Sequence, residues 1–221
     1  MYNEIIKKGY DYIKVIEDIS NGAEPSLLFK VLDAISLEPN FHLGLRLAEK
    51  KGFGDKSWFY CYEGEIDTYI RNNAHPEDPE EDFFFCYDKS EVFKIFDHLL
   101  VESSEMGAWQ TYLLSVAMSM LPTWWHGGYF RRKYIFQMED LWNHGRRISL
   151  FGPRFEQKDE YEVAPQVIKI DNFTAISACY WNDWEGMVRE KISLSMLDGK
   201  VHFKDISDKE VLYKYKCGIK F

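Results

Sequence analysis

The strongest constraint on the fold lies between Val188 and Phe203. From Val188 onwards, mostly apolar residues at even-numbered positions alternate with mostly polar residues at odd-numbered positions. This period of two predicts a half-buried strand. The even positions read Val188, Glu190, Ile192, Leu194 and Met196. Asp198-Gly199 follows, a dipeptide suited to the positive φ angles of a type I′ turn. A two-residue loop there pairs Leu197 with Lys200, Met196 with Val201, Ser195 with His202, and Leu194 with Phe203. Apolar residues then face apolar ones and polar residues face polar ones, so the pattern selects one register.

The rest of the C-terminal half extends this hairpin. Strands are predicted at 167–170 and 174–181, separated by a turn at Asp171-Asn172. A further strand is predicted where Val211, Tyr213, Tyr215 and Cys217 alternate. Together these segments predict an antiparallel β-meander of four or five strands.

The N-terminal half begins with predicted helices. The first spans residues 2–19, and its apolar face is formed by Ile6, Tyr10, Ile13 and Ile16, with Gly9 weakening it. The second starts near Pro25, and its apolar positions are Leu28, Val31, Leu32 and Ile35. Strands at 41–47 and 57–62 are then expected to form a hairpin.

The central segment combines one strand with three helices. Residues 83–87 form an apolar run typical of a buried strand, and Asp88 with Glu91 starts a helix that includes Leu99 and Leu100. Residues 108–121 are apolar on nearly all sides, which predicts a central buried helix. A last helix is expected at 130–144, ended by Gly145.

These elements define an α+β fold with N-terminal helices and a β-hairpin, central buried helices and a C-terminal antiparallel β-meander. We expect a single domain over residues 1–221. The alternative is a division into a helix-rich half, 1–122, and a meander half, 123–221.

The composition limits the function. The net charge of −9 argues against nucleic-acid binding, which needs clustered Lys and Arg. It favours a basic partner, and the alternative is that the charge serves solubility alone. No apolar signal segment follows Met1, and the longest hydrophobic stretch, 112–121, is shorter than the roughly 20 residues that span a bilayer. We therefore expect a cytoplasmic protein that does not enter the membrane.

The four cysteines stand far apart in the sequence, so we expect neither a disulfide framework nor a thiolate zinc site. They are Cys61, Cys86, Cys179 and Cys217.

Catalytic motifs are missing from the chain. The sequence contains no phosphate-binding glycine loop, nucleophile elbow or H-E-x-x-H helix, so we expect neither a cofactor nor a bound metal. This argues against an enzyme, although the partners of a Cys–His nucleophilic pair can lie far apart in sequence. The one alternative metal set is His126, Glu139, Asp140 and His144.

Glu190 is the one charged residue on the apolar face of the predicted strand, and a buried carboxylate must be paired or neutralised. Three explanations are open. It forms an ion pair with Arg146, Arg147 or Arg154. It lies at the mouth of a pocket in the curved sheet, as a ligand-binding or acid/base group near Tyr180, Asp183 and Glu185. Or the strand begins outside the core.

Two clusters of residues are candidate binding surfaces. Trp124 and Trp125 precede two glycines, and a turn near Asn182 carries Trp181, Asp183, Trp184 and Glu185. Tryptophan is enriched at the centre of protein interfaces. A proline-flanked acidic loop adds a patch for a basic partner, with Glu77, Asp78, Glu80, Glu81 and Asp82. The alternatives are indoles that close a core and a loop that is simply solvated.

The run of a strand, an aromatic-acidic turn, a long strand, Asp198-Gly199 and a returning strand resembles the β-meander of NTF2-like domains. This resemblance covers about a quarter of the chain, and the order of the N-terminal elements departs from that family. Size, acidity, aromatic content and missing catalytic motifs are similar to those of bacterial immunity proteins, which neutralise toxins. We therefore expect a non-enzymatic protein-binding protein of this immunity-like kind. The alternatives are a small-molecule-binding or hydrolytic domain with a pocket in the sheet, and a structural, oligomeric subunit.

Overall fold

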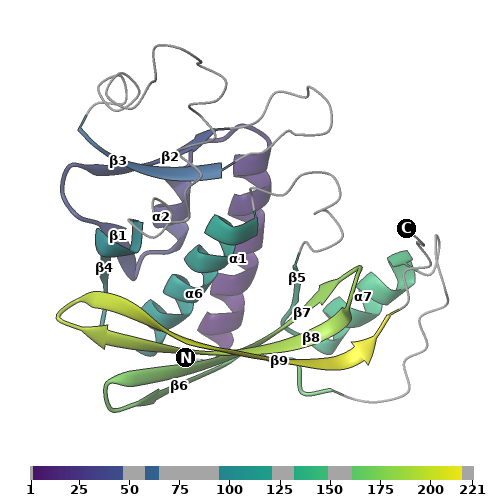
Figure 1. The fold of residues 1–221 in the computed structure, drawn as a ribbon. Coiled ribbons are helices and arrows are strands. Elements are labelled where there is room, and N and C mark those ends of the chain that lie inside the picture. The colour runs from purple at the N-terminus through teal and green to yellow at the C-terminus, as the bar shows by residue number, and fades with distance from the viewer. Residues whose placement is uncertain (1, 47–57, 65–94, 121–131, 149–160, 216–221) are drawn as a thin grey trace, which may run out of the picture.

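The computed structural model describes residues 2–46, 58–64, 95–120, 132–148 and 161–215. It confirms the α+β class (Figure 1), with a C-terminal sheet, two long helices against its inner face, and two small two-stranded sheets near the N-terminal helices. None of the helices in these ranges combines the length and apolarity needed to cross a membrane.

The C-terminal sheet is the predicted meander. Its strands β6 to β9 follow one another antiparallel, and a short strand, β5, pairs with the far end of β7. The bounds are β5 Lys133–Ile135, β6 Gln166–Ile170, β7 Phe173–Asn182, β8 Gly186–Leu197 and β9 Lys200–Lys214. All four predicted pairs around Asp198-Gly199 are confirmed, and both turn residues have positive φ, 52° and 74°.

The end of the meander differs from the prediction. The residues from Val211 do not form a separate strand; they continue β9, which stays paired with β8 as far as Lys214. Register shifts between Met187 and Val188 and between Lys191 and Ser193 absorb the extra residues of β9. Such bulges allow a strand of 15 residues to follow a partner of 12.

Helix α1 (Tyr2–Ser20) is present as predicted, but its most buried face is displaced from the predicted one. The predicted apolar residues are only partly buried, whereas the fully buried positions are Ile5, Gly9, Tyr12, Val15 and Ile19. Gly9 explains the difference, because the ring of Phe136 packs where a larger side chain would stand. Gly9 is therefore the position at which α1 contacts Phe136, and the helix face that carries Gly9 points into the core.

Helix α6 (Glu105–Met120) confirms the predicted central helix. Leu113 and Leu114 point in different directions and are both buried, so neighbours surround the helix. Its Trp109 indole donates a hydrogen bond to the Ile5 carbonyl of α1, at 3.1 Å. The helix starts three residues before the predicted position, where the Ser104 hydroxyl accepts the Gly107 N–H at 3.0 Å.

The N-terminal half contains the predicted hairpin, β2 (Phe41–Arg46) with β3 (Trp58–Glu63). The second predicted helix is shorter, α2 (Leu27–Val31). Ile35 lies instead in β1 (Ile35–Leu37), which pairs with β4 (Leu99–Val101), so placing Ile35, Leu99 and Leu100 in helices was wrong. Short apolar runs fit either structure, and here pairing between distant segments decides. The strand predicted at 83–87 and the cap at Asp88 and Glu91 lie outside the described residues.

The helix predicted at 130–144 is also corrected. Tyr134 lies in β5, and the helix, α7, spans Met138–Ile148 and passes through Gly145 without ending there. The Asp140 carboxylate accepts the backbone N–H groups of Phe136 and Gln137, both at 3.0 Å. This side-chain cap fixes the start of α7 and separates it from the strand.

Candidate functional site

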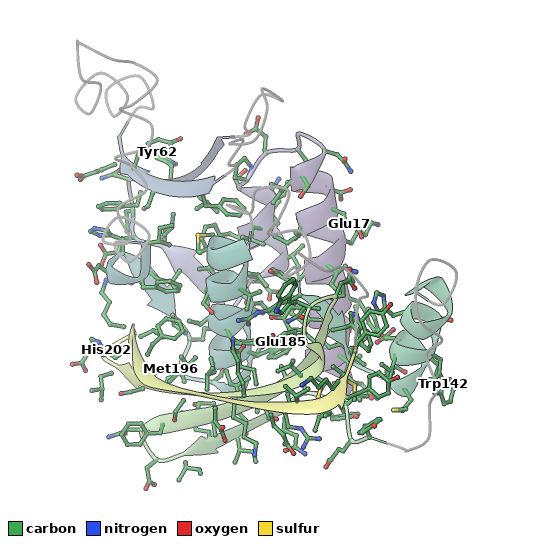
Figure 2. The ribbon with its side chains drawn as sticks, turned by 45° about the vertical axis from the view of Figure 1, so that its right-hand side comes forward. Glu17, Tyr62, Trp142, Glu185, Met196 and His202 are labelled. Atoms are coloured by element: carbon green, nitrogen blue, oxygen red, sulfur yellow. The ribbon has the colours of Figure 1, made fainter. Side chains whose placement is uncertain are left out.

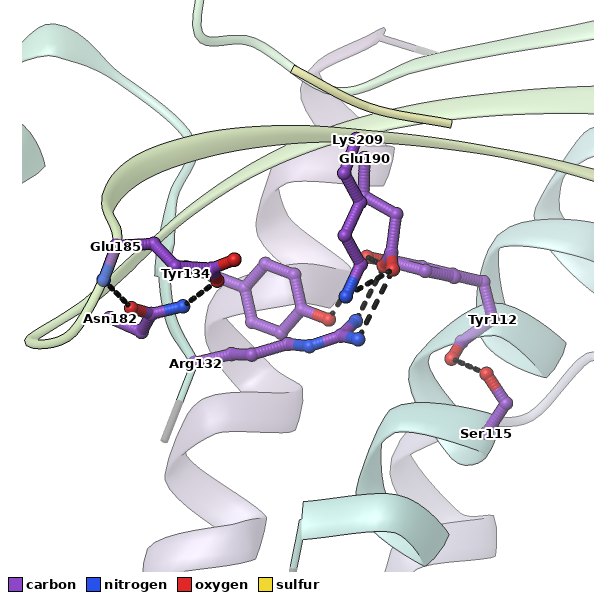
Figure 3. A network of polar contacts seen from close by, with 8 residues as sticks. All are labelled: Tyr112, Ser115, Arg132, Tyr134, Asn182, Glu185, Glu190 and Lys209. Carbon is purple, nitrogen blue, oxygen red and sulfur yellow. Dashed lines mark hydrogen bonds and ion pairs between the residues drawn. The ribbon is translucent and has the colours of Figure 1, made fainter. Parts of the chain in front are cut away.

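Glu190 lies on β8 facing the two long helices, and it is buried. The guanidinium of Arg132 binds it through two nitrogens, at 2.5 and 3.1 Å (Figure 3). An ion pair was one of the predicted explanations, but the bidentate partner is Arg132, and the Lys209 ammonium lies 3.9 Å from the same carboxylate. Arg146, Arg147 and Arg154 have no described side chains. The idea that the strand begins outside the core is wrong, because Met187 and Val188 before it are fully buried.

Tyrosine side chains surround this pair. The Tyr134 hydroxyl donates to the Tyr112 hydroxyl at 3.2 Å, and Tyr112 donates to Glu190 at 3.1 Å. The Arg132 guanidinium lies over the Tyr180 ring, 4.7 Å from its centroid. Burial raises the pKa of Tyr112 and of Tyr134 well above 10.0, and that of Tyr180 to about 12. The phenols therefore remain protonated donors at neutral pH.

The Glu190 cluster is part of the core. Glu190 is enclosed by Tyr112, Tyr134 and Arg132 between the inner sheet face and the helices (Figure 3). The buried Tyr180 ring packs against the Arg132 guanidinium. Burial opposes the charge of Arg132, but Tyr134, Tyr112 and Glu190 raise its pKa overall, so it stays cationic. A buried pair with its hydrogen bonds satisfied fixes one arrangement of the chain. Sequence reasoning missed Arg132 because β5, which places it, was predicted as part of a helix.

A cavity of about 610 Å³ lies next to this cluster, between α1, α6, β5 and α7. Arg132 and Tyr134 contribute to both, whereas Glu190 and Tyr180 do not line the cavity. Its other lining residues come mainly from α1 and α7, and they include Tyr12, Ile16, Glu17, Asp140 and His144. The residues for which a pocket was predicted, Glu190, Tyr180, Asp183 and Glu185, do not line this cavity.

Some residues of the predicted aromatic-acidic turn are buried in the core, and others lie at the surface. The Trp181 ring is fully buried, and its indole N–H donates to Asp183 at 2.9 Å. Lys133 binds the same carboxylate at 2.9 Å, and His144 lies 3.7 Å away. Burial opposes ionisation of Asp183, but His144, Lys133 and Trp181 lower its pKa well below 3.8. Asp183 is therefore held as a charged structural group.

The remaining turn residues are nearer to solvent. The Asn182 side-chain oxygen accepts the backbone N–H groups of Trp184 and Glu185, and its amide donates to the Glu185 carboxylate. Of the aromatic residues predicted here, Trp184 is exposed. The turn lies at one end of the sheet, marked by Glu185, whereas Met196 and His202 mark the other (Figure 2). Trp124, Trp125 and the acidic loop 77–82 lie outside the described residues and stay predictions.

An apolar patch that sequence reasoning missed lies on the outer face of the sheet. Ile168, Ile170 and Phe173, the outer-face patch, are 52%, 59% and 38% exposed. Ile170 pairs directly with Phe173, and Ile168 is two residues away on the same strand, so all three point to one side. Buried neighbours such as Val167 and Ile176 point to the helices. The signal was available in Gln166–Ile170, where apolar residues occupy both faces of one short strand.

Metal-ligand geometry is missing from the described ranges, where no three His, Cys, Asp or Glu side chains gather. Of the alternative metal set, Asp140 accepts hydrogen bonds from the Phe136 and Gln137 N–H groups and from the Tyr10 hydroxyl. His144 packs against Trp181, 5.2 Å between ring centroids. Burial raises the pKa of the Cys61 thiol to about 11 and also raises that of Cys179, so neither is a ready nucleophile.

Comparisons with protein-family models, with curated proteins and with solved structures give no significant match.

Proposed function

We propose that the chain is a non-enzymatic, cytoplasmic protein that binds a basic protein partner through the outer-face patch. The observation that carries this proposal is the grouping of Ile168, Ile170 and Phe173 on one solvent-facing side of β6 and β7. Single exposed apolar residues are ordinary on a protein surface, but adjacent ones mark interaction sites. An antiparallel sheet with one solvated face normally carries polar residues there.

The surroundings of the patch favour a protein over a small ligand. Across the sheet, Phe173 pairs with Ser195, and Ile168 lies beside Ala175, which pairs with Ser193. The neighbours across the sheet are thus small side chains, and the patch does not line the cavity described above. A flat apolar surface suits the centre of a protein interface, whereas small molecules bind in concave sites.

The charge of the chain defines the partner. A net charge of −9 attracts a basic surface, and exposed Asp171 lies in the turn that joins the two strands of the patch. A basic protein with an apolar centre would match both properties. Neutralisation of a basic toxin is a narrower form of this proposal, and its specific test is binding to the product of a neighbouring gene.

The test is capture of a partner from native lysate by three forms of the tagged protein. The first is the natural chain, and the second is Ile170→Ser/Phe173→Ser. The control is Trp142→Ser/Val211→Ser, which removes two apolar residues exposed elsewhere. We expect the natural chain and the control to capture the same basic protein, and the patch variant to capture at least roughly tenfold less, because central apolar contacts dominate binding.

Two outcomes would contradict the proposal. The first is equal capture of the partner by all three forms, and the second is no specific partner at all. Sedimentation at high concentration tests the structural-subunit alternative. A dimer that is lost only in the patch variant would assign the patch to a second copy of this chain.

A further inference from the structure

Tyr12 carries a hydroxyl group for which the described residues provide no hydrogen-bond partner. The residue lies in the middle of α1 and is 4% exposed, yet its hydroxyl forms no hydrogen bond with another residue in the described ranges. The neighbouring tyrosines differ, because Tyr112 and Tyr134 are both hydrogen-bonded. A hydroxyl on a side chain this deeply placed usually has a partner, so its position at the cavity wall calls for an explanation.

The cavity beside Tyr12 supplies an explanation for the position of this hydroxyl. Its inner wall is formed by the buried residues Tyr12, Tyr134, Val116 and Ala117. Its outer part is formed by exposed or half-buried residues from α1 and α7, namely Ile16, Glu17, Ser20, Asn21 and Asn143. The cavity therefore leads from a polar rim to a largely apolar interior, and the Tyr12 phenol is one of the few polar groups in that interior.

The charged groups in the cavity wall are bound within the chain or lie at its rim. Arg132 and Lys133 are bound to Glu190 and Asp183, and Glu17 is exposed at the rim. Asp140 is held by hydrogen bonds from the backbone at Phe136 and Gln137. Arg132, Lys133 and Asp140 are therefore already engaged by other groups of the chain. Burial also raises the pKa of Tyr12 well above 10.0, so its hydroxyl is a proton donor at neutral pH.

We infer that the cavity binds a small uncharged organic molecule that has an apolar body and a hydrogen-bond acceptor directed at the Tyr12 hydroxyl. The volume of about 610 Å³ lies within the usual range for ligand sites. Ile13, Ile16 and Val116 contact the apolar body, and the phenol gives the site its selectivity. This site is separate from the outer-face patch, and either can exist without the other.

The test uses three probes of nearly equal size, each titrated into the full chain and followed by ligand-observed NMR. Acetophenone has the neutral acceptor, ethylbenzene lacks it, and benzoate carries a charge. We expect acetophenone to bind most tightly and benzoate most weakly. In Tyr12→Phe the affinity for acetophenone falls by about threefold to tenfold, the effect of one hydrogen bond, while that for ethylbenzene is unchanged. Tyr62→Phe, a half-buried tyrosine on β3, is the control and leaves all three affinities unchanged.

The same variants show whether the hydroxyl is structural. If its partner is a ligand, Tyr12→Phe leaves the free energy of unfolding of the empty protein equal or slightly higher, because an unsatisfied polar group is removed. A clear loss of stability would overturn the inference, since the hydroxyl would then have a partner in the chain. Three binding results would also overturn it: benzoate binds most tightly, Tyr12→Phe binds acetophenone as well as the natural chain does, or none of the probes binds. Ile16→Trp, which fills the outer part of the cavity, is expected to abolish binding of acetophenone and ethylbenzene; unchanged binding would place the probes elsewhere.

Discussion

Arg132 binds Glu190 through both terminal nitrogens of its guanidinium group, across a separation of 58 residues in the chain. Arg132 immediately precedes β5 at one edge of the sheet, and Glu190 lies on β8, two strands away. Their side chains are only 18% and 5% exposed. The pair therefore fixes how β5 and the middle of α6 lie against the meander, because Tyr112 of α6 binds the same carboxylate.

Removing one member of this pair should destabilise the fold strongly. Arg132→Met leaves the buried Glu190 charge without its bidentate partner and with only the half-exposed Lys209 ammonium at 3.9 Å, and loss of the main partner costs roughly 3–5 kcal/mol in comparable pairs. The double variant Arg132→Met/Glu190→Leu should recover most of this loss, because no charge is stranded. Urea unfolding measures the free energy of unfolding of the single and the double variant. The adjacent Lys133→Met is the control: it removes a more exposed pair with Asp183, worth about 1 kcal/mol or less. Purely additive losses in the double variant would show that the two residues act separately.

Gly9→Ala should lower stability, although alanine is the better helix former. An added Cβ would stand 2.7 Å from Cε2 of the Phe136 ring, well inside van der Waals contact. The expected loss from overpacking is about 1–3 kcal/mol, against a gain of about 1 kcal/mol from helix propensity. Thermal or urea unfolding gives the sign. Phe136→Leu in the same chain should reverse part of the effect, and a stabilised Gly9→Ala protein would contradict the packing of Phe136.

Two glycines with positive φ provide a matched comparison. Gly186 has φ 99° and Gly199 has φ 74°, so alanine is strained at either position by about 1–2 kcal/mol. At Gly199 an added Cβ meets nothing within 4 Å, whereas at Gly186 it would stand 2.6 Å from the Tyr215 nitrogen. Gly186→Ala should therefore be clearly more destabilising than Gly199→Ala in denaturant unfolding. Equal effects would mean that β9 does not pass this close to Gly186.

The buried tyrosines predict a loss of stability in alkali. Burial raises the pKa of Tyr180 and of Tyr10 from 10.0 to about 12, and it raises the pKa of Tyr12, Tyr112 and Tyr134 as well. The folded state thus binds more protons than the unfolded state above pH 10. This contribution to stability is complete below pH 10 and is lost as the pH rises towards 12 and beyond.

Urea unfolding between pH 8 and 12, with tyrosinate absorbance followed in parallel, tests this expectation. The most buried phenols should ionise only when the chain unfolds, and Tyr180→Phe should make the loss of stability with pH less steep. If all 14 tyrosines titrate together near pH 10 in the folded protein, the tyrosine cluster is not buried as described.

The features that could be predicted from the sequence are local ones. The pairing of Leu194 with Phe203 follows from side-chain alternation and one turn dipeptide, both within ten residues of sequence. Helix α6 can be predicted equally well from the sequence, since its apolar residues extend around the whole helix. Neither prediction requires knowledge of a distant segment.

The features that were missed depend on distant partners. Ile35 forms a strand because Val101 lies opposite, and Tyr134 forms one because Tyr180 does. The inward turn of Gly9 requires the Phe136 ring, which is far along the chain. For the same reason Glu190 could be recognised as a buried carboxylate, while its partner Arg132 could not.

The alternation along β6 and β7 also determines how the chain can diverge. Val167 and Ile176 are confined by the helices, so their substitution disturbs folding, whereas Ile168, Ile170 and Phe173 face away from the core. Mutations at these three positions change the surface at little cost to the fold. Natural variants can thus drift to new specificities here without first acquiring compensating changes. A library randomised at the same positions would explore recognition while most of its members still fold.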